Sequence, residues 1–256
     1  MSRIKTVFEQ KDKAVLNVYC TAGYPQLDST VPVIESLQAA GADIVEIGIP
    51  YSDPLADGPV IQHSSTVALA NGMTLPLLLE QLRDAKKRIT VPVILMGYMN
   101  PVLQYGFEPF CKDAAEAGVD GLILPDLPEY EFRSEYGEII RRYGLDFIFL
   151  VTPETTEERV RRLDELSSGF LYAVSSSSTT GADKDMNSVE NYLRRLKGYG
   201  LKNPVLVGFG IRDRESFDRA SPHAAGAIIG TAYIKALENS TDIPGDTSRF
   251  LQNVLG

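Results

Sequence analysis

The sequence VEIGIPYSDPLADGP, residues 45–59, joins an apolar strand-like run to a stiff, proline-rich acidic loop. One carboxylate, Glu46, lies inside the apolar run, and a second, Asp57, follows eleven residues later in the loop. Burial of an unpaired carboxylate is costly or raises its pKa, so a chain seldom keeps one without a use. One desolvated and one near-solvent carboxylate are typical of acid–base catalysis, which makes Glu46 and Asp57 candidate catalytic residues.

Length and composition limit the classes of function. The chain has 256 residues, of which 44% are hydrophobic, enough for one large core; this length suits one eight-unit α/β barrel or two small domains. The 34 acidic and 25 basic residues give a net charge of −9 without a compensating basic cluster. Nucleic acid is therefore excluded as a partner, whereas a small anionic substrate requires local donors.

The N-terminal segment MSRIKTVFEQKDK is charged and amphipathic, and no run approaches the ~18 apolar residues of a membrane span. We therefore expect a cytoplasmic protein without a signal peptide or membrane anchor. In that compartment Cys20 and Cys111 are expected to be reduced thiols that pack in the core.

Short β-branched runs alternate with longer amphipathic stretches along the whole chain. The expected strands are 14–20, 43–49, 91–96, 121–124, 146–151, 169–174, 204–207 and 225–229. The expected helices are 29–40, 60–69, 75–88, 108–117, 131–143, 156–166, 188–198, 214–220 and 247–255. Gly41, Gly118 and Gly144 follow three of these helices, as C-cap glycines do.

Eight strands that are each followed by helix predict repeated βα units and a parallel sheet. An open doubly wound sheet is the alternative, but it usually carries a glycine fingerprint after its first strand, where this chain reads YCTAGYP. We predict a single (β/α)8 TIM barrel over residues 1–256. An extra N-terminal helix would cover its bottom, and a short phosphate-binding helix would follow strand eight.

Active sites of such barrels lie where strands end, so residues at these positions are the candidates. Strand alternation places Glu46 on one face with Ile44 and Gly48. Taken singly, Glu46 also fits a structural carboxylate paired with a buried donor, and Asp57 fits an Asp-Gly turn; their pairing favours catalysis. Asp53 is expected to shape the loop or an interface, and Asp126, flanked by prolines, to be structural.

Glycines after strands six, seven and eight form a second constellation. Gly181, Gly210 and Gly230 would let backbone N–H groups approach an anion, and Gly230-Thr231 begins a short helical stretch whose N-terminus favours phosphate. Simple turn glycines are the alternative. The serine-rich loop 175–178 leads to Gly181 and is interpreted as a mobile active-site loop.

Other chemistries lack their residues. No lysine lies within or directly after an expected strand, so a Schiff-base nucleophile is missing. His63 and His223 are the two histidines, and neither has a partner at metal-ligand spacing, so no metal is expected. The remaining prediction is a phosphorylated small molecule that two carboxylates act on without a covalent intermediate.

The chain resembles the tryptophan synthase α subunit family from end to end. The resemblance is carried by EIGIPYSDPLADGP (46–59), MGYMNP (96–101), GVDGLI (118–123), GFGI (208–211) and AGAIIG (225–230), of which the first is highly specific. It implies a lyase that cleaves indole-3-glycerol phosphate to indole and glyceraldehyde 3-phosphate by a retro-aldol reaction.

The resemblance also implies residue roles. Asp57 would hold and accept the indole N–H proton, Glu46 would act as general acid and base, and Tyr172 would lie near the reacting carbon. The residues that would cradle the phosphate are Gly181, Gly210, Ile211, Gly230 and Thr231. The residues that would form walls for the indole ring are Tyr19, Met96, Tyr98 and Leu124.

One loop departs from the family pattern. The family usually reads Ser-Arg-x-Gly-Val-Thr-Gly after strand six, whereas this chain reads SSSSTTG at 175–181. Thr180, which would contact Asp57 on loop closure, is retained, but Ser176 replaces the common arginine. This replacement implies weaker loop closure or weaker coupling to the partner.

The resemblance implies a β-subunit partner in an α2β2 complex that receives the indole. Pyridoxal phosphate would belong to that subunit and no cofactor to this chain. Loops 53–59 and 100–106 resemble the docking surface. Two other readings stay open: another phosphosugar isomerase or synthase barrel, which would lack the carboxylate pair, and a phosphate-sensing subunit, which would need only the phosphate cradle.

Overall fold

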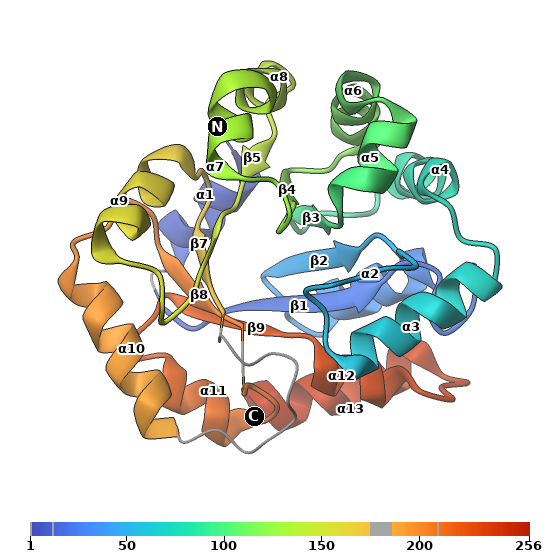
Figure 1. The fold of residues 1–256 in the computed structure, drawn as a ribbon. Coiled ribbons are helices and arrows are strands. Elements are labelled where there is room, and N and C mark those ends of the chain that lie inside the picture. Colours follow the sequence, from blue (N-terminus) through green and yellow to red (C-terminus); the bar gives the residue numbers. More distant parts are fainter. Residues whose placement is uncertain (1, 12, 175–185, 209) are drawn as a thin grey trace.

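The computed structural model describes residues 2–11, 13–174, 186–208 and 210–256 (Figure 1). All neighbouring strands pair in parallel, in the order β5-β4-β3-β2-β1-β9-β8-β7-β6. The strands are β1 Val15–Thr21, β2 Ile44–Gly48, β3 Val93–Met96, β4 Gly121–Ile123, β5 Asp146–Phe147, β6 Leu150–Val151, β7 Leu171–Ala173, β8 Val205–Val207 and β9 Gly226–Ile229.

The two edge strands of this sheet, β5 and β6, are consecutive parts of one segment, the expected strand 146–151. Between them the segment changes partner: Ile148 N donates to Leu122 O of β4, and Phe149 O accepts from Tyr172 N of β7, both at 3.0 Å. The ring of strands therefore closes through this segment. The predicted (β/α)8 barrel is confirmed, with strand five divided in two at the change of partner.

Helices surround the ring of strands (Figure 1). They are α1 Arg3–Gln10, α2 Thr30–Ala39, α3 Pro59–Ala70, α4 Leu75–Ala85, α5 Met99–Tyr105, α6 Phe107–Ala117, α7 Glu129–Glu131, α8 Gly137–Arg142, α9 Glu157–Leu166, α10 Met186–Gly198, α11 Arg214–Ala220, α12 Thr231–Leu237 and α13 Ile243–Leu255, with a π-helical segment, η1 Phe132–Tyr136, between α7 and α8. Gly41, Gly118 and Gly144 have φ of 99°, 91° and 71°, which confirms their predicted role as left-handed helix ends. No helix among these described residues is long and apolar enough to cross a bilayer.

The helices differ from the prediction in two places. Helix α5 lies where a loop at 100–106 was expected; its seven residues are too short for a periodic pattern, and Asp126 accepts a 3.0 Å hydrogen bond from Met99 N at its start. The helix expected at 131–143 is instead a succession of α7, η1 and α8. Composition and periodicity do not distinguish a π turn from an α turn.

In the described ranges, two apolar clusters form the core. The larger one joins the strands to the surrounding helices, whereas the smaller one fills the lower part of the barrel. The smaller cluster contains the inward-facing residues Val15, Ile44, Ile94, Ile123, Ile148, Phe170, Leu206 and Ile228, together with Ile4 of α1. Ile4 is fully buried, and a Cβ on Gly121 would lie 3.0 Å from its Cδ1. Helix α1 therefore packs against the bottom of the barrel.

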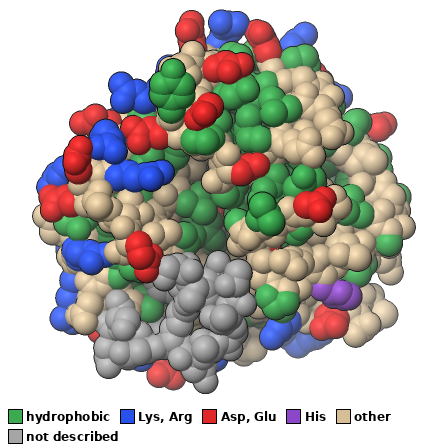
Figure 2. All heavy atoms as spheres, in the orientation of Figure 1, with side chains coloured by type: hydrophobic (Ala, Val, Ile, Leu, Met, Phe, Trp, Pro, Cys, Tyr) green, Lys and Arg blue, Asp and Glu red, His purple; other side chains and the backbone are tan. Residues whose placement is uncertain are grey.

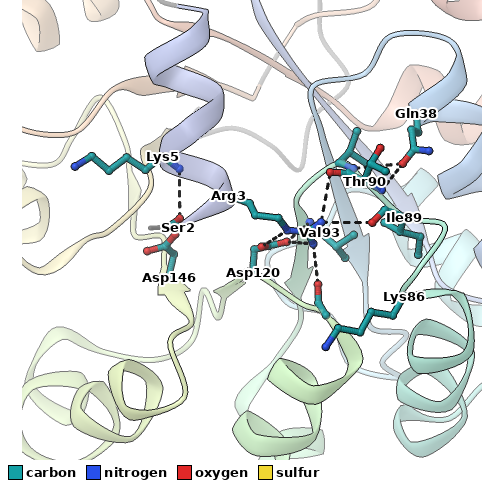
Figure 3. A network of polar contacts seen from close by, with 12 residues as sticks. Ser2, Arg3, Lys5, Gln38, Lys86, Ile89, Thr90, Val93, Asp120 and Asp146 are labelled. Atoms are coloured by element: carbon teal, nitrogen blue, oxygen red, sulfur yellow. Dashed lines mark hydrogen bonds and ion pairs between the residues drawn. The ribbon is translucent and has the colours of Figure 1, made fainter.

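A polar network fastens α1 to that end of the barrel (Figure 3). Arg3 donates from Nε and Nη2 to the two carboxylate oxygens of Asp120, each at 2.7 Å, and from Nη2 to Gly118 O at 3.0 Å. Asp120 also accepts from Val93 N at 2.8 Å, and Ser2 donates its hydroxyl proton to Asp146. These contacts hold the bottom face and leave the opposite face, where strands end, for chemistry.

Candidate active site

Glu46 lies at the centre of β2 and faces the barrel interior. Its side chain is fully buried, and Asn17 of β1 donates from Nδ2 to its Oε2 at 2.8 Å. Burial raises the pKa of Glu46 to about 8; the Asn17 hydrogen bond opposes this rise and the negative charge of Asp57 adds to it. At neutral pH Glu46 is therefore mainly protonated and able to act as an acid.

Asp57 lies in the loop that follows β2, and the loop fixes its position. Its N–H donates to Pro54 O at 3.2 Å, and Gln62 of α3 donates to its carbonyl oxygen at 2.8 Å. Tyr98, after β3, accepts from Ala56 N at 3.0 Å and hydrogen-bonds the Asp57 carboxylate. Burial raises the pKa of Asp57 to about 6, against the opposing effect of the Tyr98 hydrogen bond.

The two carboxyl groups lie close enough to interact, since the charge of Asp57 contributes to the raised pKa of Glu46. Their pKa values nevertheless differ, at about 8 and about 6. Between about pH 6 and about pH 8, Glu46 is protonated and Asp57 is ionised. That is the arrangement required of an acid and a fixed anion.

Two buried tyrosines complete the interior beside Glu46, Tyr19 of β1 and Tyr172 of β7. The pKa of each is raised well above its ordinary value, chiefly by burial and further by the charges of Asp57 and Glu46. Both therefore stay neutral. Their rings occupy space that glycines leave open: a Cβ on Gly48 would lie 2.0 Å from Tyr19 Oη, and one on Gly208 would lie 1.9 Å from Tyr172 Cε2.

The residues expected to form walls for the indole ring lie at different depths in the structure. Tyr98 is buried beside Asp57, and Met96, at the end of β3, is partly buried and packs against both apolar clusters. Leu124, directly after β4, is buried in the larger cluster, whereas Ile123 belongs to the cluster inside the barrel. Alternation along β4 thus directs Ile123, which is not among the wall residues expected from the sequence, into the interior.

The expected phosphate residues lie after β8 and β9. Gly210 has φ of 70°, Ile211 is buried, and Gly230 is the N-cap of α12, followed by the exposed Thr231. The first N–H groups of α12 have no acceptor within the helix and can bind an anion. Thr180 and Gly181, like Ser176, lie outside the described residues.

Several other expectations concern residues beside the site. Asp126 accepts from Met99 N through both oxygens, a structural role as predicted. Asp53 is exposed. Cys20 and Cys111 are buried and free, as predicted. His63 lies on α3 and His223 in the turn before β9; within the described ranges, no group of three or more histidine, cysteine, aspartate or glutamate residues could hold a metal ion.

The surface around the site is apolar at its centre. Figure 2 shows apolar side chains over the central part of this face, with Lys and Arg mostly at the rim. Leu55, in the loop that carries Asp57, is 91% exposed, and Leu103 of α5 is 49% exposed. Large exposed apolar side chains next to a site are typical of a surface that binds a partner.

Comparison with known proteins identifies the family. The family model described as tryptophan synthase alpha chain matches residues 6–254. The chain belongs to this family. It is 50% identical to the tryptophan synthase alpha chain of Parabacteroides distasonis over 240 residues, which cover 93% of each chain. It is 47% identical to that of Phocaeicola vulgatus over 256 residues, covering 100% of this chain and 98% of the relative.

Solved structures of tryptophan synthase have the same fold. Tryptophan synthase subunit alpha from Legionella pneumophila matches with a TM-score of 0.91 and 36% identity, over 99% of this chain and 97% of that one. Tryptophan synthase from M. tuberculosis in its aminoacrylate-bound form matches with a TM-score of 0.87 and 33% identity, over 99% and 100% of the two chains. The family resemblance seen in the sequence is thereby confirmed.

Proposed function

We propose that Glu46 and Asp57 are the acid–base pair with which this chain performs the α reaction of tryptophan synthase. Membership of the family makes the chain an enzyme of tryptophan biosynthesis. The α reaction is the retro-aldol cleavage of indole-3-glycerol phosphate to indole and glyceraldehyde 3-phosphate. The observation that supports our assignment is a fully buried Glu46, with its pKa raised to about 8, beside an Asp57 with a pKa of about 6.

The first step moves two protons. Protonated Glu46 gives its proton to indole C3, and ionised Asp57 accepts the N–H proton of the ring. The product is a 3H-indole in which C3 carries both hydrogen and the glycerol chain. Protonation of C3 is favourable only while the positive charge on the ring nitrogen is removed, so the two carboxylates act together.

The second step breaks the carbon–carbon bond. Glu46, now a carboxylate, takes the hydroxyl proton from the adjacent carbon of the glycerol chain. The bond between that carbon and C3 breaks, its electrons restore the aromatic ring, and Asp57 returns its proton to nitrogen. Both carboxyl groups recover their starting states, and the products are indole and an aldehyde.

The phosphate would be bound on the other side of the site. Gly210, Ile211, Gly230 and Thr231 follow β8 and β9, at the face of the barrel where phosphate sites are usual. Phosphate bound there would direct the glycerol chain toward Glu46. The indole ring would lie among Tyr19, Tyr98, Tyr172 and Met96, apolar or neutral groups at the same end of the barrel.

We further propose that the chain acts with a β subunit in an α2β2 complex. Exposed Leu55 and Leu103 lie in the two segments, 53–59 and 100–106, that would contact the partner. Pyridoxal phosphate would be held by the β subunit, which would consume the indole. The loop after β2 would then carry both a catalytic carboxylate and part of the partner surface.

The test is to incubate the purified chain with indole-3-glycerol phosphate and to measure indole, with and without a β subunit. We expect release of indole in both cases and faster release in the complex. Binding of glycerol phosphate without release of indole under either condition would overturn the lyase assignment and favour a phosphate-sensing subunit.

A further inference from the structure

Asn17 is a polar residue in an otherwise apolar part of the barrel interior. It lies on the inward face of β1, in register with Ile44 and two positions before Tyr19, which pairs with Glu46. Its side chain is fully buried. Its inward-facing neighbours are Val15 on the same strand, Ile44 of β2 and Ile228 of β9. An apolar side chain of the same size would therefore fill this position without the cost of desolvating an amide.

The side-chain amide of Asn17 donates a hydrogen bond to one carboxyl oxygen of Glu46. Its Nδ2 donates to Glu46 Oε2 at 2.8 Å, while its own Oδ1 is buried without a hydrogen-bond partner in the described part of the chain. A buried amide that leaves its oxygen unsatisfied is unfavourable for stability. What the amide adds is control of the carboxyl group opposite.

The two carboxyl oxygens of Glu46 also differ in their hydrogen bonding. Oε2 is occupied by the Asn17 amide, whereas Oε1 is buried and has no hydrogen-bond partner among the residues that the structure describes. Of the two oxygens, Oε1 is thus the one that can exchange a proton with a substrate. An unpaired buried oxygen is costly in the empty site and gains a partner when a substrate is bound.

We propose that Asn17 is a positioning residue for Glu46: its amide holds Oε2 and presents Oε1 as the oxygen that protonates indole C3 and then accepts the hydroxyl proton. This inference rests on the proposed function. With Oε2 already accepting a hydrogen bond, the proton of the acid form sits on Oε1. After proton transfer, the same amide stabilises the carboxylate at the moment its charge appears.

The ionisable groups that interact with Glu46 make this testable by pH. Among the described residues they are Tyr19 of β1, Asp57 in the loop after β2 and Tyr172 of β7, which line the interior, and Cys20 on the outward face of β1. Burial raises the pKa of Cys20 to about 12 and that of both tyrosines well above 10, so these groups remain neutral. Asp57 ionises near pH 6, below Glu46. A loss of activity near pH 8 therefore reports Glu46.

The experiment compares wild type with Asn17→Leu, an apolar side chain of similar size. We expect kcat for indole release to fall at least tenfold and KM to change less than threefold. Loss of the amide donor disfavours the carboxylate, so the pKa of Glu46 rises and the alkaline limb of activity moves to higher pH. Val18→Ala, the adjacent outward-facing residue on β1, is the packing control, with kcat expected within twofold of wild type.

A double variant tests whether Asn17→Leu acts through the position of Glu46 or through a general disturbance of the structure. In a Glu46→Gln background, Asn17→Leu is expected to change the residual rate less than twofold, because its effect passes through the Glu46 carboxyl group. A folded Asn17→Leu protein with wild-type kcat and an unmoved alkaline limb would overturn the proposal. An equal loss of rate in the Glu46→Gln background would also overturn it.

If Asn17→Leu does not fold, Asn17→Asp keeps the shape of the side chain. The second carboxyl group replaces the donor, so kcat is expected to fall and the alkaline limb to move to higher pH; an unchanged profile overturns the proposal.

Failure of the proposed function would give different results from failure of the role of Asn17. Wild type would release no indole, or Glu46→Gln would remain active. An active wild type, an inactive Glu46→Gln and a normal Asn17→Leu would defeat only the role of Asn17.

Discussion

At neutral pH Glu46 and Asp57 are in opposite protonation states, because burial raises their pKa values to about 8 and about 6. Glu46→Gln removes the proton donor and Asp57→Asn removes the proton acceptor. Each is expected to lower kcat for indole release by about 10²–10⁴-fold, the usual contribution of a general acid or base. Calorimetry with glycerol phosphate should show nearly unchanged binding. Asp53→Asn, an exposed residue in the same loop, is the matched control; near-normal turnover in either active-site variant would refute the assigned roles.

The same pKa values predict a bell-shaped pH dependence of kcat/KM. Activity should rise as Asp57 ionises near pH 6 and fall as Glu46 loses its proton near pH 8. The steady-state rate of indole release between pH 5 and 10 measures both limbs. Activity that increases steadily through pH 9 would show that Glu46 does not act as the initial acid.

Glu46 also links function to stability. Its pKa in the folded chain, about 8, is above the value of 4.5 for an exposed carboxyl group, so folding favours the protonated form. Its contribution to stability is complete below about pH 4.5 and is lost as pH rises through about 8. Glu46→Gln should therefore raise the free energy of unfolding at pH 8–9, by an amount on the order of a few kcal/mol, with little change near pH 5. Urea denaturation at the two pH values measures the difference, and equal effects at both would contradict the burial argument.

Among the elements, helix α1 contributes to stability and not to chemistry. Ile4 fills the bottom of the barrel, so Ile4→Ala should lower the free energy of unfolding by about 2–5 kcal/mol. The remaining folded protein should keep its kcat, because Ile4 lies at the end of the barrel opposite the site. Lys5→Ala, an exposed residue on the same helix, is the control and should change stability by less than about 0.5 kcal/mol. A large loss of kcat in folded Ile4→Ala would mean that the two ends of the barrel are coupled.

The elements also show what the sequence could predict. Periodicity and C-cap glycines identified the strands and most helices, because long regular patterns reflect burial on one face. Helix α5 was missed because its seven residues show little periodicity and its first N–H is satisfied by Asp126, far along the chain. Within the site, the Glu46–Asp57 pair could be selected from its sequence context. Asn17 could not, since its partner, Glu46, is 29 positions away and only the register of β1 and β2 brings them together.

At the scale of the whole molecule, the apolar face around the site should bind the β subunit. Leu55→Asp and Leu103→Asp are each expected to weaken that complex at least tenfold, about 1.4 kcal/mol, because a charge would be buried at the interface. Indole release by the isolated chain should change little. Leu69→Asp, on the exposed side of α3, is the control. Unchanged affinity in both loop variants, measured by titration with the β subunit, would place the partner elsewhere.

The contacts that hold α1 against the bottom of the barrel determine when this helix can dock during synthesis of the chain. Arg3 and its partner Asp120 are 117 positions apart, and Ser2 and Asp146 are 144 positions apart. When the first residues leave the ribosome, the groups that will bind them have not yet been translated. Helix α1 must therefore wait, undocked, until residues 120 and 146 have emerged, and nascent fragments that stop before residue 120 lack the carboxylate that receives Arg3.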